Sequence, residues 1–187
     1  MEPSIMLSSG HLFDFLAPSV EEVPLEVLAR SLSRICRFAG HTDVFYSVAE
    51  HSFWVSQIVP EDLALAGLFH DLHEALVGDV PSPLKALLPE YREIERRAWK
   101  AVAGCYGLPV ELPPEVKRAD LVMLATERRY LMPDGDKPWA SLKGIKPLTL
   151  AARLGMPPEQ ACRLFMDRAR ELMSPDCALR AASSPAI

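Results

Sequence analysis

The stretch LALAGLFHDLHEALVGDVPSPLK, residues 63–85, decides how the chain folds and where its polar chemistry lies. Its first part, residues 63–76, is mostly Leu, Ala, Phe and Gly, which predicts a helix that is apolar over most of its circumference and therefore buried. Four polar residues interrupt this surface: His70, Asp71, His73 and Glu74. The spacing places His70, Asp71 and Glu74 on one patch of about 100° of the helix. His73 points away from this patch.

This patch has the chemistry of a metal site. Burying an imidazole and two carboxylates together is unfavourable unless a positive charge compensates them, and a divalent cation does so better than a side chain. Two further candidate ligands are His51, in the sequence AEHS, and Asp120, which lies among apolar neighbours. Two histidines and two aspartates suit zinc, manganese, cobalt or iron. No two of them share a ligand cassette, so spacing alone leaves open the alternative of hydrogen-bonded core histidines and surface carboxylates.

The second part of the stretch, GDVPSPLK, predicts a fixed turn directly after the charged patch. Its prolines are expected to forbid a helix through residues 81–83. We expect the turn to bring Asp79 and Lys85 back over the site.

Composition excludes several classes of protein. With 187 residues and 49% hydrophobic content, the chain can bury one good core, which favours a single domain. A formal net charge of −5 argues against a surface for polymeric nucleic acid or an anionic membrane. The four cysteines lie far apart, which favours reduced thiols in a cytoplasmic protein. No window reaches the roughly 18 uninterrupted apolar residues of a membrane span.

Apolar periodicity predicts an all-α fold, a compact helical bundle without internal repeats or an alternating strand pattern. The predicted helices cover residues 24–40, 48–59, 63–77, 90–106, 113–132 and 158–173. We expect three regions: an irregular N-terminal arm at 1–22, a helical domain at 23–173 and a mobile tail at 174–187. A long loop rich in turn formers, residues 133–147, precedes the last helix.

The order of these motifs resembles the HD-domain metal phosphohydrolases, in particular bacterial 5′-deoxynucleotidases and phage dATP triphosphohydrolases. The motifs are AEHS, FHDLHEA, GDVPSPLK and VKRAD, and the likeness extends upstream to RICRFAGHTDVFYSVAEHS and downstream to ATERRYLM. An HD pair alone is common, but an HD pair followed by these motifs in this order is specific. The resemblance implies an HD-type fold.

The resemblance also implies roles for individual residues. The metal ligands would be His51, His70, Asp71 and Asp120. Glu74 would orient or deprotonate the attacking water, Asp79 would be a second acidic group near substrate or metal, and Arg37 would hold the phosphate. Lys85 would be a second phosphate contact, or would only cap its turn.

The position after Arg37 bears on sugar selectivity. In the resembling deoxynucleotidases a bulky aromatic residue there crowds the ribose 2′ position, and this chain has Phe38 in place of the larger tryptophan. The alternative is that Phe38 closes the apolar stripe of the helix predicted at 24–40.

These implications lead to an expected function. A divalent ion (Zn, Co, Mn or Fe, with additional Mg as an option) would assist direct attack of water on a deoxynucleotide, cleaving the bond from the α-phosphorus to the 5′-oxygen. The substrate could be a dNMP, releasing phosphate, or a dATP-like dNTP, releasing triphosphate. No concentrated basic cluster is evident for three phosphates, which favours the monophosphate, whereas likeness in the N-terminal half favours the triphosphate. The alternative is a catalytically idle nucleotide-binding signalling module, and we also expect a homo-oligomer.

Overall fold

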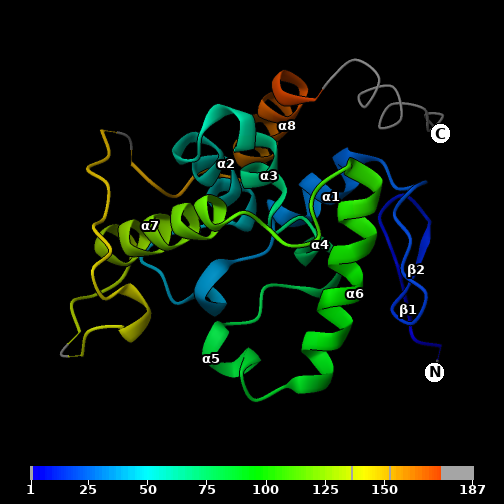
Figure 1. The fold of residues 1–187 in the computed structure, drawn as a ribbon, viewed down its shortest axis with the longest axis horizontal. Helices are drawn as coiled ribbons and strands as arrows, with labels where there is room; N and C mark the ends of the chain where they lie inside the picture. The colour runs from blue at the N-terminus through cyan, green and yellow to red at the C-terminus, as the bar shows by residue number, and fades with distance from the viewer. Residues whose placement is uncertain (1, 136, 152, 174–187) are drawn as a thin grey trace.

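The computed structural model describes residues 2–135, 137–151 and 153–173, and over these residues the chain is mostly helical, as predicted (Figure 1). The α-helices are α1 Leu25–Leu32, α2 Val48–Ile58, α3 Ala64–Phe69, α4 Glu74–Val77, α5 Ser82–Lys85, α6 Pro89–Tyr106, α7 Pro114–Leu131 and α8 Pro158–Leu172. Short 3-10 turns cover Arg37–Gly40, Glu61–Leu63 and Ala140–Leu142. None of the described helices is both long and apolar enough to cross a membrane. The predicted tail at 174–187 lies outside the described residues.

Helices α2, α3 and α8 pack against one another and form the centre of the fold, with α7 and α6 on either side of them in Figure 1. The side chain of Ser47 caps α2 by accepting a hydrogen bond from the Glu50 N–H. Between α3, α6 and α8, Phe69 stacks on Phe165 and meets the edge of Tyr106. This apolar centre fixes α2 and α3, the two helices that precede the charged residues 70–74.

The N-terminal arm is more ordered than predicted. Strands β1 Ser4–Met6 and β2 Leu12–Asp14 pair antiparallel, with Ile5 opposite Phe13. Phe13 is buried in the core. Strands of three residues are too short to produce an alternating sequence pattern, which is why periodicity missed them.

The helix predicted at 24–40 is wrong in its second half, because α1 ends at Leu32. The following backbone bonds to the segment before α2: Cys36 forms a bridge with Ser47, and the Arg37 N–H donates to the Tyr46 carbonyl over 3.0 Å. Phe38 then adopts a left-handed conformation with a φ of 55°. Arg37 therefore lies in a separate turn, and Phe38 does not belong to the apolar stripe of α1.

The central helix is also interrupted where the charged motif lies. The α3 helix ends at Phe69 and α4 begins at Glu74. Between them the backbone tightens to 3-10 bonding, since the Leu72 N–H donates to Phe69 and the Glu74 N–H to Asp71, each over 2.9 Å. The short α5 helix corrects the prediction for residues 81–83: it begins at Ser82, because Pro83 in its first turn lacks only an N–H that a helix does not use there.

The other predicted helices agree with α2, α6, α7 and α8 to within about two residues, the usual uncertainty of helix ends. The α6 helix ends at Gly107, which has a φ of 67° and so adopts the left-handed conformation common at helix ends. The buried carboxylate of Glu50 ties α2 to the segment before α8. It accepts hydrogen bonds from the N–H groups of Gly155 (3.0 Å) and Met156 (2.7 Å).

Candidate metal centre

The structure brings the four predicted metal ligands together from three parts of the fold. His51 lies on α2, Asp120 on α7, and His70 and Asp71 lie in the break between α3 and α4. The Nε2 atom of His51 is 3.3 Å from the Nε2 of His70, 3.2 Å from an Asp120 oxygen and 3.8 Å from an Asp71 oxygen. The same Asp71 oxygen is 3.1 Å from His70 Nε2. One ligand atom each from His51, His70 and Asp120 lies within 4.8 Å of the others, so this group can hold a metal ion.

The hydrogen bonds of the two histidines fit a cation at this point. The Nδ1 of His70 is 2.8 Å from the Gly67 carbonyl oxygen, and the Nδ1 of His51 is 2.5 Å from a Glu127 oxygen. Both acceptors require a proton on Nδ1, which leaves the Nε2 lone pairs facing the same space. Lone pairs at 3.3 Å repel unless a positive charge lies beside them. The donor set therefore fits a divalent ion of the zinc, cobalt, manganese or iron type.

The positive charges around the ligand cluster oppose protonation of Asp71. Burial acts to raise the pKa of Asp71, but His70, His51 and Arg37 hold it well below its usual range. Burial and Arg37 act to lower the pKa of His51, whereas Glu127 and Asp120 outweigh them and raise it to about 9. Without a metal, the carboxylates therefore favour the protonated, positively charged form of His51. A bound cation would supply this positive charge in its place.

Arg37 lies directly beside the ligands and is buried. Its Nη1 is 3.6 Å from an Asp71 oxygen and its Nη2 is 3.3 Å from a Glu127 oxygen, while its buried Nε finds no hydrogen-bond partner in the described part of the chain. The guanidinium also lies 5.5 Å from the ring centre of Phe38. Phe38 in turn is 6.1 Å from Trp139, between ring centres, so it meets the 133–147 loop. Arg37 can therefore present donors to an anion bound beside the metal ligands.

Glu74 and Asp79 are two further acidic residues that interact electrostatically with Asp71. Glu74 is 4% exposed, and its Oε2 is buried without a hydrogen-bond partner among the residues described. Burial, together with Asp71 and Asp79, raises the pKa of Glu74 well above its ordinary value. Burial is also the main cause that raises the pKa of Asp79. A carboxyl group with a raised pKa beside a cluster of metal ligands is suited to proton transfer.

Lys85 does more than cap its turn. Its Nζ forms an ion pair with Glu95 and lies 3.9 Å from a Glu74 oxygen. Glu95 also lies 3.6 Å from the Nε2 of His73, so His73 faces away from the ligand cluster, as predicted. Lys85 is thus held by two carboxylates beside the site.

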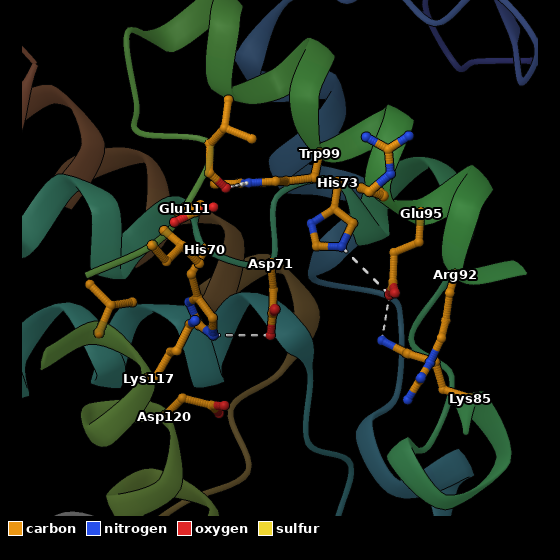
Figure 2. Close-up of a pocket in the computed structure, with 14 residues that line it drawn as sticks. His70, Asp71, His73, Lys85, Arg92, Glu95, Trp99, Glu111, Lys117 and Asp120 are labelled. Carbon is orange, nitrogen blue, oxygen red and sulfur yellow. Dashed lines mark hydrogen bonds and ion pairs between the residues drawn. The ribbon is translucent and has the colours of Figure 1, made fainter. Parts of the chain in front are cut away.

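A pocket of about 440 Å³ extends from the ligand cluster (Figure 2). His70, Asp71 and Asp120 line one side of it, and the other lining residues include two acidic side chains, Glu95 and Glu111, and four cationic ones: Lys85, Arg92, Arg96 and Lys117. These four come from α5, α6 and α7. Folding thus brings four cationic side chains to one pocket, although no run of basic residues in the sequence indicates it.

Glu127 is a residue of the site that was not predicted from the sequence. Glu127 is fully buried on α7 and contacts both His51 and Arg37. It follows Asp120 by seven residues, which is two helical turns, so both lie on the same face of α7. That spacing was the available signal.

The sequence of the chain is similar to those of several known proteins. The chain is 42% identical over 164 residues to the uncharacterized protein YfdR of Escherichia coli, which covers 88% of this chain and 92% of that protein. An uncharacterized protein of Rhodobacter capsulatus is 33% identical over 169 residues, covering 81% and 86% of the two chains. A 5′-deoxynucleotidase of Photorhabdus laumondii is 32% identical over 94 residues, covering 48% and 47%.

The family model described as 5′-deoxynucleotidase YfbR-like matches residues 39–130. The chain belongs to the YfbR-like 5′-deoxynucleotidase family. Membership confirms the resemblance drawn from the motifs and makes the chain a hydrolase of the nucleotidase class. In the YfbR-like match, the four ligands, Glu74, Asp79 and Glu127 all lie inside the matched residues, whereas Arg37 and Phe38 precede them.

Proposed function

We propose that this protein is a metal-dependent phosphohydrolase that cleaves deoxynucleotides between the α-phosphorus and the 5′-oxygen by direct attack of water. One observation carries the proposal: two imidazole Nε2 atoms and two carboxylates converge, and the nearby buried Glu74 has one oxygen, Oε2, without a hydrogen-bond partner among the described residues. His51, His70, Asp71 and Asp120 would hold the metal. When bound, a divalent cation neutralises charge on the phosphoryl oxygens and makes water a stronger acid.

The protein side chains supply the remaining steps. Glu74 accepts the proton of the attacking water at Oε2, and its raised pKa makes it a stronger base than an ordinary carboxylate. Arg37 donates hydrogen bonds to the phosphoryl oxygens and offsets the charge that develops on them. The negative charge of Asp79 contributes to the raised pKa of Glu74. The nucleoside leaves with the 5′-oxygen, and no covalent enzyme intermediate forms.

The four cationic side chains of the pocket favour a dNTP as a substrate in addition to a dNMP. The groups around the α-phosphate are mostly carboxylates, so the added negative charge of two more phosphates needs cations elsewhere. Arg92 and Lys117 line the pocket and form no ion pair within the described ranges, which leaves both available to a ligand. A chain of phosphates that starts at the ligand cluster and runs along the pocket would meet them.

A substrate scan tests the proposed activity. Purified protein would be incubated with dNMPs and dNTPs and with Zn²⁺, Co²⁺, Mn²⁺ or Mg²⁺, and the products separated by chromatography. We expect a free deoxynucleoside together with phosphate or triphosphate, and no product in the presence of a chelator. Tight nucleotide binding without any product would instead support the idle signalling module.

A double variant separates the two substrates. Arg92→Gln with Lys117→Gln should lower kcat/KM for a dNTP by about 10-fold, because two charge-assisted hydrogen bonds are lost, and leave the value for the matching dNMP unchanged. The control is Lys100→Gln with Arg118→Gln, which removes charges from the same two helices outside the pocket. An equal loss for both substrates would assign the pocket to the nucleoside and not to the phosphates.

Phe38 should set sugar selectivity. A ring packed against C2′ would leave a ribose hydroxyl without a hydrogen-bond partner, at a penalty of roughly 1 to 3 kcal/mol, or about 5- to 150-fold in kcat/KM. We expect deoxyadenosine nucleotides to be favoured over adenosine nucleotides and Phe38→Ala to narrow the ratio. Phe45→Ala, at an exposed aromatic residue, is the control. Equal rates on both sugars in the parent enzyme would remove Phe38 from sugar recognition.

A further inference from the structure

Glu127 uses its two carboxylate oxygens for two different partners. Its Oε1 lies 2.5 Å from the Nδ1 of His51, and its Oε2 lies 3.3 Å from the Nη2 of Arg37. The Glu127 side chain has no solvent exposure, and that of His51 has none either. Water therefore cannot replace the contact with His51, and the Nδ1 of that histidine depends on this carboxylate.

The contact with His51 determines what that histidine presents to a metal. Because Glu127 accepts the Nδ1 proton, Nε2, which faces His70 and Asp120, is the nitrogen that remains to bind a metal. A carboxylate on the second nitrogen also fixes the ring plane and makes the imidazole a stronger ligand. Without Glu127, the buried Nδ1–H would have no acceptor and the ring could rotate away.

The contact with Arg37 determines where the guanidinium stands. Glu127 accepts a hydrogen bond from Nη2, and Asp71 forms a longer ion pair with Nη1 at 3.6 Å, so the guanidinium lies between α7 and the ligand cluster. Two anchors on one planar group leave little freedom for its head. The Glu127 side chain thus contacts both His51, a proposed metal ligand, and Arg37, the proposed phosphate-binding residue.

We propose that Glu127 is a positioning residue that fixes His51 through one oxygen and Arg37 through the other, so that metal affinity and phosphate binding depend on the same buried side chain. The roles of His51 and Arg37 in this statement rest on the proposed function. Glu127 itself does not touch the substrate.

The variant Glu127→Gln tests this. The amide has nearly the same shape but offers one oxygen and one NH₂, so one of the two contacts must become donor facing donor. Competition with a chromophoric chelator would give the dissociation constants for Zn²⁺ and Co²⁺, which should rise about 10- to 100-fold. The visible absorption spectrum of the Co²⁺ form should also change. Inorganic phosphate should bind more weakly to the metal-saturated variant, measured by titration calorimetry.

The matched control is Glu50→Gln. Glu50 is equally buried and precedes His51 on α2, but its oxygens accept backbone N–H groups from Gly155 and Met156. This variant should lower the melting temperature and leave the metal dissociation constants unchanged. Metal binding that weakens equally in both variants would reduce Glu127 to a structural residue and overturn the proposal.

Folding failure of Glu127→Gln would not end the test. Glu127→Asp keeps the negative charge in the buried site but withdraws the oxygens by one methylene, and should show the same loss of metal affinity. Parental affinity in a folded Glu127 variant would overturn the positioning role and leave the proposed function intact. A parent protein that binds no metal at all would overturn both, so the two failures are distinguishable.

Discussion

Replacing Glu74 by glutamine is expected to lower turnover by about 10²- to 10⁴-fold, the range usual for a residue that transfers a proton in the transition state. The amide cannot accept the proton of the attacking water at Oε2. Glutamine keeps the shape of the side chain and removes the charge whose burial is unfavourable, so the fold and the neighbouring ligands should be retained. Metal and nucleotide dissociation constants should stay near those of the parent.

The measurement is steady-state hydrolysis with metal content and thermal melting recorded on the same preparations. Glu50→Gln serves as the control, because it alters an equally buried carboxyl group that lies outside the reaction. It should lower stability with little change in kcat. Near-normal turnover of Glu74→Gln would remove Glu74 from the mechanism.

Loss of a metal ligand is expected to have the second large effect. His70→Ala or Asp71→Ala should abolish both the tightly bound metal and the hydrolysis, because each removes an atom of a cluster whose members lie 3.1 to 3.8 Å apart. The parent should carry close to one transition metal ion per chain. Elemental analysis of purified protein measures this directly.

His73→Ala is the control for this experiment. His73 lies in the same break between α3 and α4, but its Nε2 faces Glu95 at 3.6 Å and not the ligand cluster. The His73 variant should therefore retain its metal. Full metal content in the His70 and Asp71 variants would contradict the ligand assignment, whatever their activity.

The parts of the fold that follow regular periodicity could be predicted from the sequence. The α6 and α7 helices have long amphipathic patterns and clear ends, such as Gly107 after α6, and the prediction matches them closely. The break in the central helix could not be predicted, because His70 and His73 keep right-handed helical angles and only the hydrogen-bond pattern tightens. The left-handed turn at Phe38 is likewise set by tertiary pairing of Cys36 with Ser47.

The candidate site also has residues that could be predicted from the sequence and residues that could not. The polar residues inside an apolar helix drew attention to His70, Asp71 and Glu74, because buried charge needs a compensating partner. Glu127 lies on a helix with many other charged residues, so only its seven-residue spacing from Asp120 separates it in the sequence from a solvated carboxylate. The four cationic side chains of the pocket come from three helices that lie close together only in the folded chain. No local sequence pattern indicates that these side chains line one pocket.

The central claim is that water attacks the α-phosphorus and releases the intact deoxynucleoside. Hydrolysis of a deoxynucleotide in ¹⁸O-labelled water, followed by mass spectrometry of both products, tests it most directly. We predict ¹⁸O in the released phosphate or triphosphate and none in the 5′-hydroxyl of the deoxynucleoside. Label in the 5′-hydroxyl, or a product that retains the α-phosphate on the nucleoside, would contradict the account.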